Sequence, residues 1–475
     1  MSDREFDVIV IGGGPAGEVL AGRLADNSDK SVAIVEEHLL GGECSYYACM
    51  PSKALLRPQE VLSEARRIPG AREAVNGGPD VSAVLERRDR VIHGLDDEGQ
   101  VEWVGSRGIE LVRGHGRLDG ERRVRVNGEV LEAREAVVIA VGSGSAAPPI
   151  PGLADVETWT NREVTTTSEI PSRLIVLGGG VVGVEMAQAW HSLGSEVVIV
   201  ELFDRLLARE EPFVGEELAA AFGDLGIEVR TGTKAVGAER SGEGVVLELD
   251  GGERVEGPRL LVATGRRPLT DDLGLESVGL GAGAYLEVDE TLRVPGHPWL
   301  YAVGDVNGRA LLTHMGKYQA RLAADRIAFS EDGRIADPWG DRELRAGGPS
   351  GGMPAHGPAS PRVVFTDPQV AAVGHTLASA REAGVSVKEV DLPTSGTAGA
   401  SFYGRNAPGT TRFVVDTDRE VLVGATFVGP EVADFLHAAT IAVVGELPLR
   451  TLVHAVPPFP ARTELWLKFL EAYGL

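Results

Sequence analysis

The chain has 475 residues, 43% of them hydrophobic, so it is long enough to fold as about three domains without disulfide staples. Its 46 basic and 70 acidic residues give a net charge of −24, which argues against nucleic acid or an anionic membrane as a partner. No stretch approaches ~18 uninterrupted apolar residues, and the charged N-terminus has no signal-peptide layout, so we expect a soluble cytoplasmic protein.

Residues 6–36 predict a strand, a glycine-rich turn, a helix and a second strand. The first strand is an apolar run typical of a buried parallel strand, and the second ends in Glu36, 24 residues after the first glycine of the turn. Gly12, Gly14 and Gly17 permit a tight turn and the close approach of a pyrophosphate to the helix N-terminus. An acid placed like Glu36 accepts hydrogen bonds from a ribose diol.

Cys44 and Cys49, the only cysteines of the sequence, follow this unit. Two cysteines five positions apart near the start of a helix can face each other across one distorted helical turn, and a helix N-terminus favours the reactive thiolate. The pattern indicates a redox-active pair, with two buried thiols or a structural disulfide as alternatives. We expect no metal site, because zinc needs about four ligands and no other cysteine exists.

A charged helical region over about 54–105 and a β-rich stretch over about 109–140 lead to a Pro-rich linker at 148–152. Residues 174–201 then repeat the strand, turn, helix and strand of the first unit, and their second strand ends in Glu201. The glycines of this turn are Gly178, Gly180 and Gly183. Two such units indicate two dinucleotide sites, although glycine turns without a ligand are the structural alternative.

The second acid also bears on the choice of nucleotide. A carboxylate at Glu201 suits a free 2′-hydroxyl and repels a 2′-phosphate, and residues 202–205 offer no adjacent basic pair. NADH is therefore favoured over NADPH, and Arg205 keeps the NADPH alternative open.

Taken in order, these motifs resemble those of the flavoprotein pyridine nucleotide–disulfide oxidoreductases, the family of dihydrolipoamide dehydrogenase, glutathione reductase and mercuric reductase. The resemblance runs essentially end to end. Besides the two glycine motifs, it is carried by G-G-x-C-x4-C-x-P-S-K at 41–53, A-x-G-S at 140–143, A-T-G-R-R-P at 263–268, Y-A-V-G-D-V at 301–306 and V-F-T-D-P at 364–368.

The resemblance implies an α/β fold with two Rossmann-like, three-layer FAD/NAD(P)-binding domains and a C-terminal α+β dimerisation domain. It also implies a homodimer in which each terminal domain faces the disulfide of the partner. The flexible linker at 346–360 precedes that terminal domain. The expected ranges are 1–150 and 276–345 for the two parts of the FAD-binding domain, 151–275 for the NAD(P)-binding domain and 361–475 for the dimerisation domain.

The resemblance further implies a route for electrons. NADH passes hydride to FAD, the reduced flavin opens the Cys44–Cys49 disulfide, and the dithiol reduces an acceptor by thiol exchange. Cys49 is the flavin-proximal sulfur, which forms a charge-transfer thiolate, and Cys44 is the outer sulfur that attacks the substrate. Lys53 lies near flavin N5, where it stabilises the anionic reduced flavin, and Glu185 keeps this lysine oriented.

Binding residues for FAD and NADH are implied in the same way, with NADPH less favoured. For FAD they are Gly12, Gly14, Gly17, Glu36, Gly42, Lys53, Gly116, Ser143, Asp305, Leu312 and Thr313. For the nicotinamide nucleotide they are Gly178, Gly180, Gly183, Glu201 and Gly265.

One departure concerns the C-terminal motif. Family members that act on dithiols end in a His-Pro-Thr-x-Ser-Glu-type motif, whose histidine is the general acid/base supplied by the partner subunit. Here Glu464 is present as the catalytic glutamate, but Phe459 stands at the histidine position. Phenylalanine cannot move a proton, and losing a general acid/base costs about 10²–10⁴-fold. A shifted alignment that uses His454 is the alternative.

Other departures lie near the cysteines and at the C-terminus. Tyr46 and Tyr47 stand between the cysteines, and three roles are open for them. One of them serves as a weak acid, or they narrow the access to Cys44, or they pack as aromatic residues at a domain or subunit boundary. The C-terminus has no cysteine, which argues against a terminal redox relay and against a mercuric reductase with a terminal metal-receiving pair. Acidic pairs such as 210–211 and 216–217 are expected on solvated faces.

Three functions fit these observations. The first is an NADH-dependent, FAD-containing oxidoreductase that reduces a small-molecule disulfide or other electrophilic acceptor through the two cysteines. The second is a diaphorase-like enzyme whose electrons leave from FAD to a quinone-type acceptor. The third is a flavoprotein that serves as a structural or redox-sensing subunit without turnover.

Overall fold

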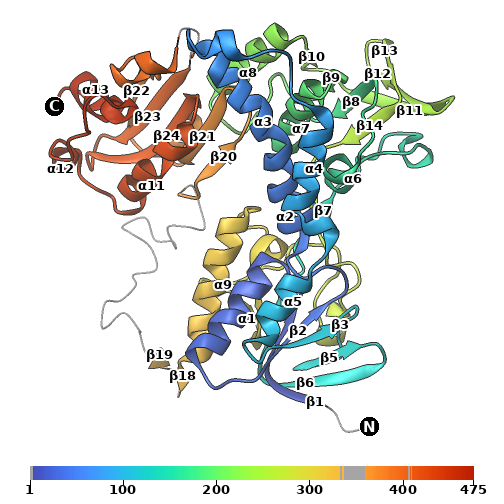
Figure 1. The fold of residues 1–475 in the computed structure, drawn as a ribbon. Helices are drawn as coiled ribbons and strands as arrows, with labels where there is room; N and C mark the ends of the chain where they lie inside the picture. The colour runs from blue at the N-terminus through green and yellow to red at the C-terminus, as the bar shows by residue number, and fades with distance from the viewer. Residues whose placement is uncertain (1–3, 332–333, 336–358, 405–406, 408) are drawn as a thin grey trace. The chain divides into compact units, whose positions relative to one another are not determined.

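The computed structural model describes residues 4–331, 334–335, 359–404, 407 and 409–475 (Figure 1). The chain forms two compact units. Unit 1 comprises Met1–Pro51, Asp89–Ser145 and Arg266–Gly357, and unit 2 comprises Ser52–Arg88, Ala146–Gly265 and Pro358–Leu475. Over the described residues, none of the helices combines the length and the hydropathy needed to cross a membrane.

Unit 1 is built on a mixed sheet with the strand order β16-β17-β6-β1-β2-β3, from which β5 and β4 extend as an antiparallel hairpin on β6. Strands β17, β6, β1, β2 and β3 are parallel, as expected for the apolar run that forms β1. The strands are β1 (Arg4–Ile11), β2 (Val32–Glu36), β3 (Glu110–Arg113), β4 (Arg117–Leu118), β5 (Arg123–Val126), β6 (Glu129–Ile139), β16 (Arg293–Val294) and β17 (His297–Ala302).

Helices cover one face of this sheet. Helix α1 (Pro15–Asn27) packs along α9 (Thr313–Ala328), and α5 (Glu98–Gly105) lies beside α1 (Figure 1). Leu20 of α1 and Ala320 of α9 are fully buried against the sheet, where they close one of the two hydrophobic cores of the unit. Smaller elements are the pair β7 (Ser143–Ser145) and β15 (Arg266–Pro268), the pair β18 (Ser330–Glu331) and β19 (Arg334–Ile335), and helix α2 (Gly42–Tyr46).

The first lobe of unit 2, which contains the helices and strands between Asn161 and Val262, has two sheets. One is parallel with the order β10-β9-β8-β14, and the other is antiparallel with the order β11-β12-β13. Trp190 is fully buried between this parallel sheet and the residues that cover it. The elements are α6 (Asn161–Thr166), β8 (Arg173–Leu177), α7 (Val181–Ser192), β9 (Glu196–Val200), α8 (Pro212–Leu225), β10 (Glu228–Arg230), β11 (Ala235–Ser241), β12 (Gly244–Leu249), β13 (Arg254–Gly257) and β14 (Arg259–Val262).

The second lobe of unit 2 is the expected α+β terminal domain. Its antiparallel sheet has the order β20-β21-β24-β23-β22, and Phe413, Phe427 and Phe469 pack at its centre. The elements are β20 (Arg362–Val364), β21 (Gln369–Gly374), α10 (Leu377–Glu382), β22 (Val387–Pro393), β23 (Thr410–Asp416), β24 (Val421–Gly429), α11 (Leu436–Val444), α12 (Leu449–Leu452) and α13 (Leu465–Tyr473).

The compact units divide the chain differently from the predicted range 1–150. Helix α3 (Cys49–Arg67) starts in unit 1, but residues 52–88, which include most of α3 and of α4 (Val81–Val91), belong to unit 2. The reason is packing: Leu55 and Val84 lie in the same core as Trp190. The linker predicted at 346–360 lies almost entirely outside the described residues.

The sequence predicts the acidic pairs at 210–211 and 216–217 on solvated faces, but not all of these carboxylates are solvated. Glu211 is only 2% exposed and accepts hydrogen bonds from the Leu377 amide (2.7 Å) and from Arg412 (2.9 Å). Glu210 pairs with Arg362, and Glu217 accepts from Thr410. Their partners lie in the second lobe, more than 150 positions away in sequence, so these carboxylates join the two lobes of unit 2.

Candidate functional site

The first glycine turn has the close packing that its glycines predict. Gly12 has φ +105°, a conformation that side chains other than hydrogen disfavour. A Cβ on Gly17 would lie 2.0 Å from the carbonyl oxygen of Gly12, so the third glycine lets α1 approach the turn. At Gly14 a Cβ would meet no atom within 4 Å, and no side chain caps α1 there. The N-terminus of α1 is therefore open to an anion.

The predicted cofactor residues of unit 1 gather at one edge of the sheet. Gly12, Glu36, Ser143 and Asp305 each lie at or just after the end of a parallel strand, and such ends form the ligand crevice of α/β folds. Glu36 accepts hydrogen bonds from the amides of Gly13 and His38, both at 2.7 Å, so its carboxylate is fixed beside the turn.

Two further glycines allow close backbone packing around this edge. Gly42 has φ +59°, and a Cβ on it would lie 2.8 Å from the Cα of Gly14, so α2 can begin directly against the first glycine turn. A Cβ on Gly116 would lie 2.8 Å from Val35, at the end of β2. Glycine is therefore required at both positions for steric reasons, independently of any ligand.

A polar cluster of unit 1 surrounds Asp305. The Ser143 hydroxyl donates to Asp305 at 2.6 Å, and Arg266 donates to the same hydroxyl at 2.7 Å. Burial raises the pKa of Asp305, while the Ser143 hydrogen bond and Arg266 oppose that shift. A half-buried carboxylate at a strand end can accept further hydroxyl donors, which suits a sugar alcohol chain.

The two cysteines lie on separate helices rather than on one distorted turn. Cys44 is in α2, Cys49 is the first residue of α3, and both are thiols in this structure. The Thr313 hydroxyl, at the start of α9, lies 3.4 Å from the Cys49 sulfur. A hydrogen bond to Cys49 and burial raise the pKa of the Cys44 thiol, so Cys44 keeps its proton at neutral pH. Leu312 is the N-cap residue of α9 beside Thr313.

Lys53 and Glu185, both in unit 2, form the predicted pair. The Lys53 ammonium lies 2.6 Å from Glu185, whose other carboxylate oxygen accepts from the Phe365 amide at 2.9 Å. Lys53 also lies 4.9 Å from the centre of the Phe365 ring. Because Glu185 is only 3% exposed, the pair holds the lysine in a fixed direction.

The second glycine turn, in unit 2, repeats the first. Gly178 has φ +109°, and a Cβ on Gly183 would lie 1.9 Å from its carbonyl oxygen. Gly180 is open and is the N-cap of α7, which no side chain caps. Glu201 is the first residue after β9 and is 7% exposed. Its carboxylate accepts hydrogen bonds from the amides of Gly179 and Phe203.

Gly265 and Arg205 also bear on the second nucleotide site. Gly265 has φ +148° and follows β14 at the same edge as Gly178. Arg205, the residue that kept NADPH open, donates to the Ala208 carbonyl at 3.1 Å and to Asp204. This arginine is therefore already engaged by its own loop.

The C-terminal motif places its two key residues differently. Phe459 is 78% exposed, whereas the Glu464 carboxylate accepts a hydrogen bond from the Gly399 amide at 3.2 Å. The glutamate thus fixes a backbone turn of its own lobe. His454, the alternative general acid/base, is an exposed residue that follows α12.

The tyrosines between the cysteines have separate roles. Tyr46 is fully buried, and its hydroxyl donates to Gln100 at 3.0 Å. Burial raises its pKa to about 12, which makes Tyr46 a packing residue rather than an acid at neutral pH. Tyr47 is half-buried, with its ring centre 6.3 Å from that of Tyr46.

Comparison with known proteins decides the family. Residues 6–323 match the pyridine nucleotide-disulphide oxidoreductase family, and residues 360–468 match the dimerisation domain of that family. The chain belongs to this family. It is an FAD-dependent disulfide oxidoreductase, since members bind FAD and use pyridine nucleotides.

Relatives of the chain have more than one activity in their names. Dihydrolipoyl dehydrogenase of Thermus scotoductus is 33% identical over 99% of this chain and 97% of that protein. Mercuric reductase of Staphylococcus aureus is 29% identical over 97% of this chain and 81% of that protein. The solved structure of LpdA from Mycobacterium tuberculosis has a TM-score of 0.82 and 24% identity, covering 99% of this chain and 100% of that one.

The residues of unit 1 fit FAD. The open backbone at Gly14 and the uncapped N-terminus of α1 suit a pyrophosphate, and Glu36 and Asp305 offer fixed carboxylates to hydroxyl groups. Among the described residues, no group of three or more histidine, cysteine, aspartate or glutamate side chains could hold a metal ion.

The structure adds contacts that the motifs did not contain. Thr313 touches Cys49, Arg266 supports Ser143, and the Phe365 amide holds Glu185. Each contact joins segments more than 100 positions apart, so local spacing carried no signal for it. Arg266 and Phe365 do lie inside motifs that the sequence presents, at 263–268 and 364–368.

Substitution of two glycines should separate packing from ligand approach. We expect Gly17→Ala to lower the stability of the FAD-stripped protein by about 1–3 kcal/mol, because its Cβ would clash with the Gly12 carbonyl. Gly14→Ala should leave that stability unchanged, because its Cβ meets nothing, yet it should weaken FAD binding at least about tenfold. Denaturant unfolding and FAD titration measure the two effects. Equal loss of stability in both variants would contradict this assignment.

Proposed function

We propose that the chain is an NADH-dependent enzyme that reduces a small disulfide or related electrophile through Cys44 and Cys49. The observation that carries this proposal is the placement of both thiols, with Thr313 touching Cys49, in the same unit as the open glycine turn. FAD, when bound, supplies the transfer of hydride equivalents between the nicotinamide and the disulfide.

The dithiol performs the reduction in two exchanges. The Cys44 thiol loses its proton as its sulfur bonds to one sulfur of the acceptor, the acceptor disulfide bond breaks, and the leaving thiolate takes that proton. The Cys49 thiolate then attacks the Cys44 sulfur, which re-forms the internal disulfide and releases the second acceptor sulfur as a thiolate, which takes a proton from solvent. Two electrons pass from the enzyme to the acceptor. The Thr313 hydroxyl serves by donating to the Cys49 thiolate.

Glu201 supports NADH as the reductant. Its carboxylate is held by the Gly179 and Phe203 amides, where it can accept from a ribose diol and would repel a 2′-phosphate. Arg205 is bound to its own loop, which further disfavours NADPH.

The cofactor preference can be reversed in part by one change. We expect Glu201→Gln to lower the ratio of kcat/KM for NADH to that for NADPH by about 10- to 100-fold, since it removes a charge next to the 2′ position. Glu196→Gln, at the exposed start of the same strand, is the matched control and should leave the ratio unchanged. Steady-state kinetics with each nucleotide decide this, and an unchanged ratio for Glu201→Gln would assign the preference to another residue.

Phe459 narrows the range of acceptors. Dihydrolipoamide and glutathione chemistry rely on the histidine of the family motif, and an exposed phenylalanine supplies no proton. The acceptor is therefore a strained or activated disulfide, or another electrophile, whose leaving group needs little acid assistance.

The terminal lobe supports a homodimer. It contains a dimerisation-domain match, and several of its apolar side chains are more than half exposed. These side chains are Ile441 (53%), Phe402 (65%), Phe459 (78%) and Val456 (81%). Burying them against a second copy removes apolar surface from water, which stabilises association.

Counting thiols tests the proposal directly. Oxidised holoenzyme is incubated anaerobically with NADH, alkylated and digested, and the labelled cysteines are identified by mass spectrometry. We expect labels on Cys44 and Cys49 only after NADH is added. Absence of new labels, with the flavin reduced, would instead support the diaphorase-like function, which the missing histidine also favours.

A further inference from the structure

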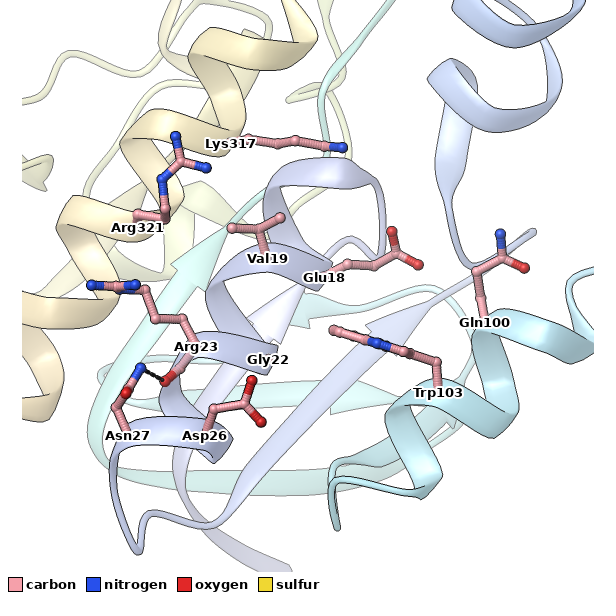
Figure 2. Close-up of a pocket in the computed structure, with 10 residues that line it drawn as sticks. All are labelled: Glu18, Val19, Gly22, Arg23, Asp26, Asn27, Gln100, Trp103, Lys317 and Arg321. Carbon is pink, nitrogen blue, oxygen red and sulfur yellow. Dashed lines mark hydrogen bonds between the residues drawn. The ribbon is translucent and has the colours of Figure 1, made fainter.

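A cavity of about 380 Å³ opens on unit 1 between α1, α5 and α9 (Figure 2). Glu18 of α1 points into it toward Gln100 and Trp103 of α5, and Lys317 extends from α9 over the start of α1 (Figure 2). The Glu18 Oε1 atom is buried and has no hydrogen-bond partner among the described residues. A buried, unpartnered carboxylate oxygen is costly and needs an explanation.

This cavity lies next to the helix that carries Cys44. Gly42, the first residue of α2, packs against Gly14, one turn before Glu18 on α1. Tyr46 of α2 donates to Gln100, which lines the cavity. Helix α2 therefore packs against the N-terminal end of α1, beside the cavity that Glu18 enters.

Helix α9 provides a second link between Glu18 and the two cysteines. Thr313 contacts Cys49, and Lys317 follows one helical turn later on the same face of α9. The positive charge of Lys317 acts on both Glu18 and Cys44, whose pKa values it lowers. Glu18, Lys317 and the dithiol thus share one electrostatic environment.

Glu18 is poised to exchange protons near neutral pH. Burial raises its pKa to about 7, with Glu36 and Asp97 adding to the shift and Lys317 opposing it. Groups with a pKa near the working pH are the best general acids and bases. The charged or titratable groups that face Glu18 from its neighbours are Glu36 on β2, Tyr46 on α2, Asp97 before α5, and Lys317 on α9, while Arg23 and Arg321 line the outer cavity.

We propose that Glu18 is the proton-transfer residue of the dithiol, in place of the histidine that is absent at position 459; this rests on the proposed function. The Glu18 carboxylate takes the proton of the Cys44 thiol as the sulfur bonds to the acceptor. The carboxylic acid then gives this proton to the thiolate that leaves when the acceptor disulfide breaks. Glu18 ends each exchange in its starting state, and Lys317 positions it electrostatically.

The alkylation rate of Cys44 against pH tests this role without turnover. Holoenzyme is reduced with dithiothreitol, desalted anaerobically and treated with iodoacetamide, and labelling of Cys44 is followed by peptide mass spectrometry. In the native enzyme we expect the rate to rise through an inflection near pH 7. In Glu18→Gln this inflection should be lost and the rate at pH 7.5 should fall at least about tenfold.

The direction of the change separates a base from a mere charge. If Glu18 acted only as a negative charge, its removal would favour the Cys44 thiolate and speed alkylation. An unchanged or faster rate in Glu18→Gln therefore overturns the proposal. Asp26→Asn is the matched control, because it removes one charge from the exposed end of the same helix, and its profile should equal the native one.

Lys317→Gln gives an independent test. Removing this positive charge should raise the pKa of Glu18 and move the inflection to higher pH, whereas an unmoved inflection would contradict the pairing. Because the thiols are reduced chemically, these results do not depend on NADH. Failure of NADH to expose the thiols would refute the proposed function, while the alkylation profiles judge Glu18 separately.

Discussion

Replacing Cys44 with serine should lower turnover with any disulfide acceptor by at least about 10⁴-fold, since the variant has lost the sulfur that forms the mixed disulfide. The substitution lies in unit 1, so it changes no residue of the terminal lobe or of the second glycine turn. NADH oxidation coupled to reduction of a disulfide measures the loss.

Two controls make that result specific. Ser45→Ala changes the residue next to Cys44, keeps both sulfurs and should retain activity. A Cys44→Ser, Cys49→Ser double variant should still pass electrons from NADH to a quinone, because that route does not need the thiols. Retention of disulfide reduction in Cys44→Ser would contradict the assignment of the outer sulfur.

Phe459→His should raise turnover with lipoamide or glutathione disulfide by about 10²–10⁴-fold, the range that a positioned general acid/base contributes. Phe459 is 78% exposed in the single chain, so a smaller, polar ring there disturbs no core of the protomer. Glu464 remains in the same motif, and only its Oε2 atom is used by the Gly399 amide.

Phe402→His is the matched control for this gain. Phe402 is also an exposed aromatic residue of the terminal lobe, at 65%, but it lies outside the family motif. Steady-state rates with both disulfides compare the two variants. If Phe459→His gains nothing, the acceptor pocket rather than the missing base limits these substrates.

The motifs predicted the parts of the molecule whose constraints are local. Gly12 and Gly178 adopt the positive φ that a glycine turn requires. Glu36 and Glu201, which their spacing predicted as acids for a ribose diol, lie beside these turns and accept hydrogen bonds from turn amides. The contact of Lys53 with Glu185 was also expected from the family resemblance.

Other features depend on partners that sequence patterns do not reveal. Residues 52–88 join unit 2 because Leu55 finds its core among residues more than 100 positions away. Glu211 is buried by an arginine and an amide of the terminal lobe, although an acidic run is usually solvated. Glu18 lies in an ordinary helix turn, and only the packing of α5 and α9 around it encloses its carboxylate.

The most direct test of the central claim is an anaerobic titration of the holoenzyme with NADH, followed by visible absorption, with NADPH run in parallel. We expect NADH to produce, after two electrons, a long-wavelength band from the Cys49 thiolate next to oxidised FAD, which requires that the Cys44–Cys49 disulfide has been opened. Simple bleaching of the flavin without this band would show that electrons stop at FAD, and would contradict a role for the two cysteines in the electron path.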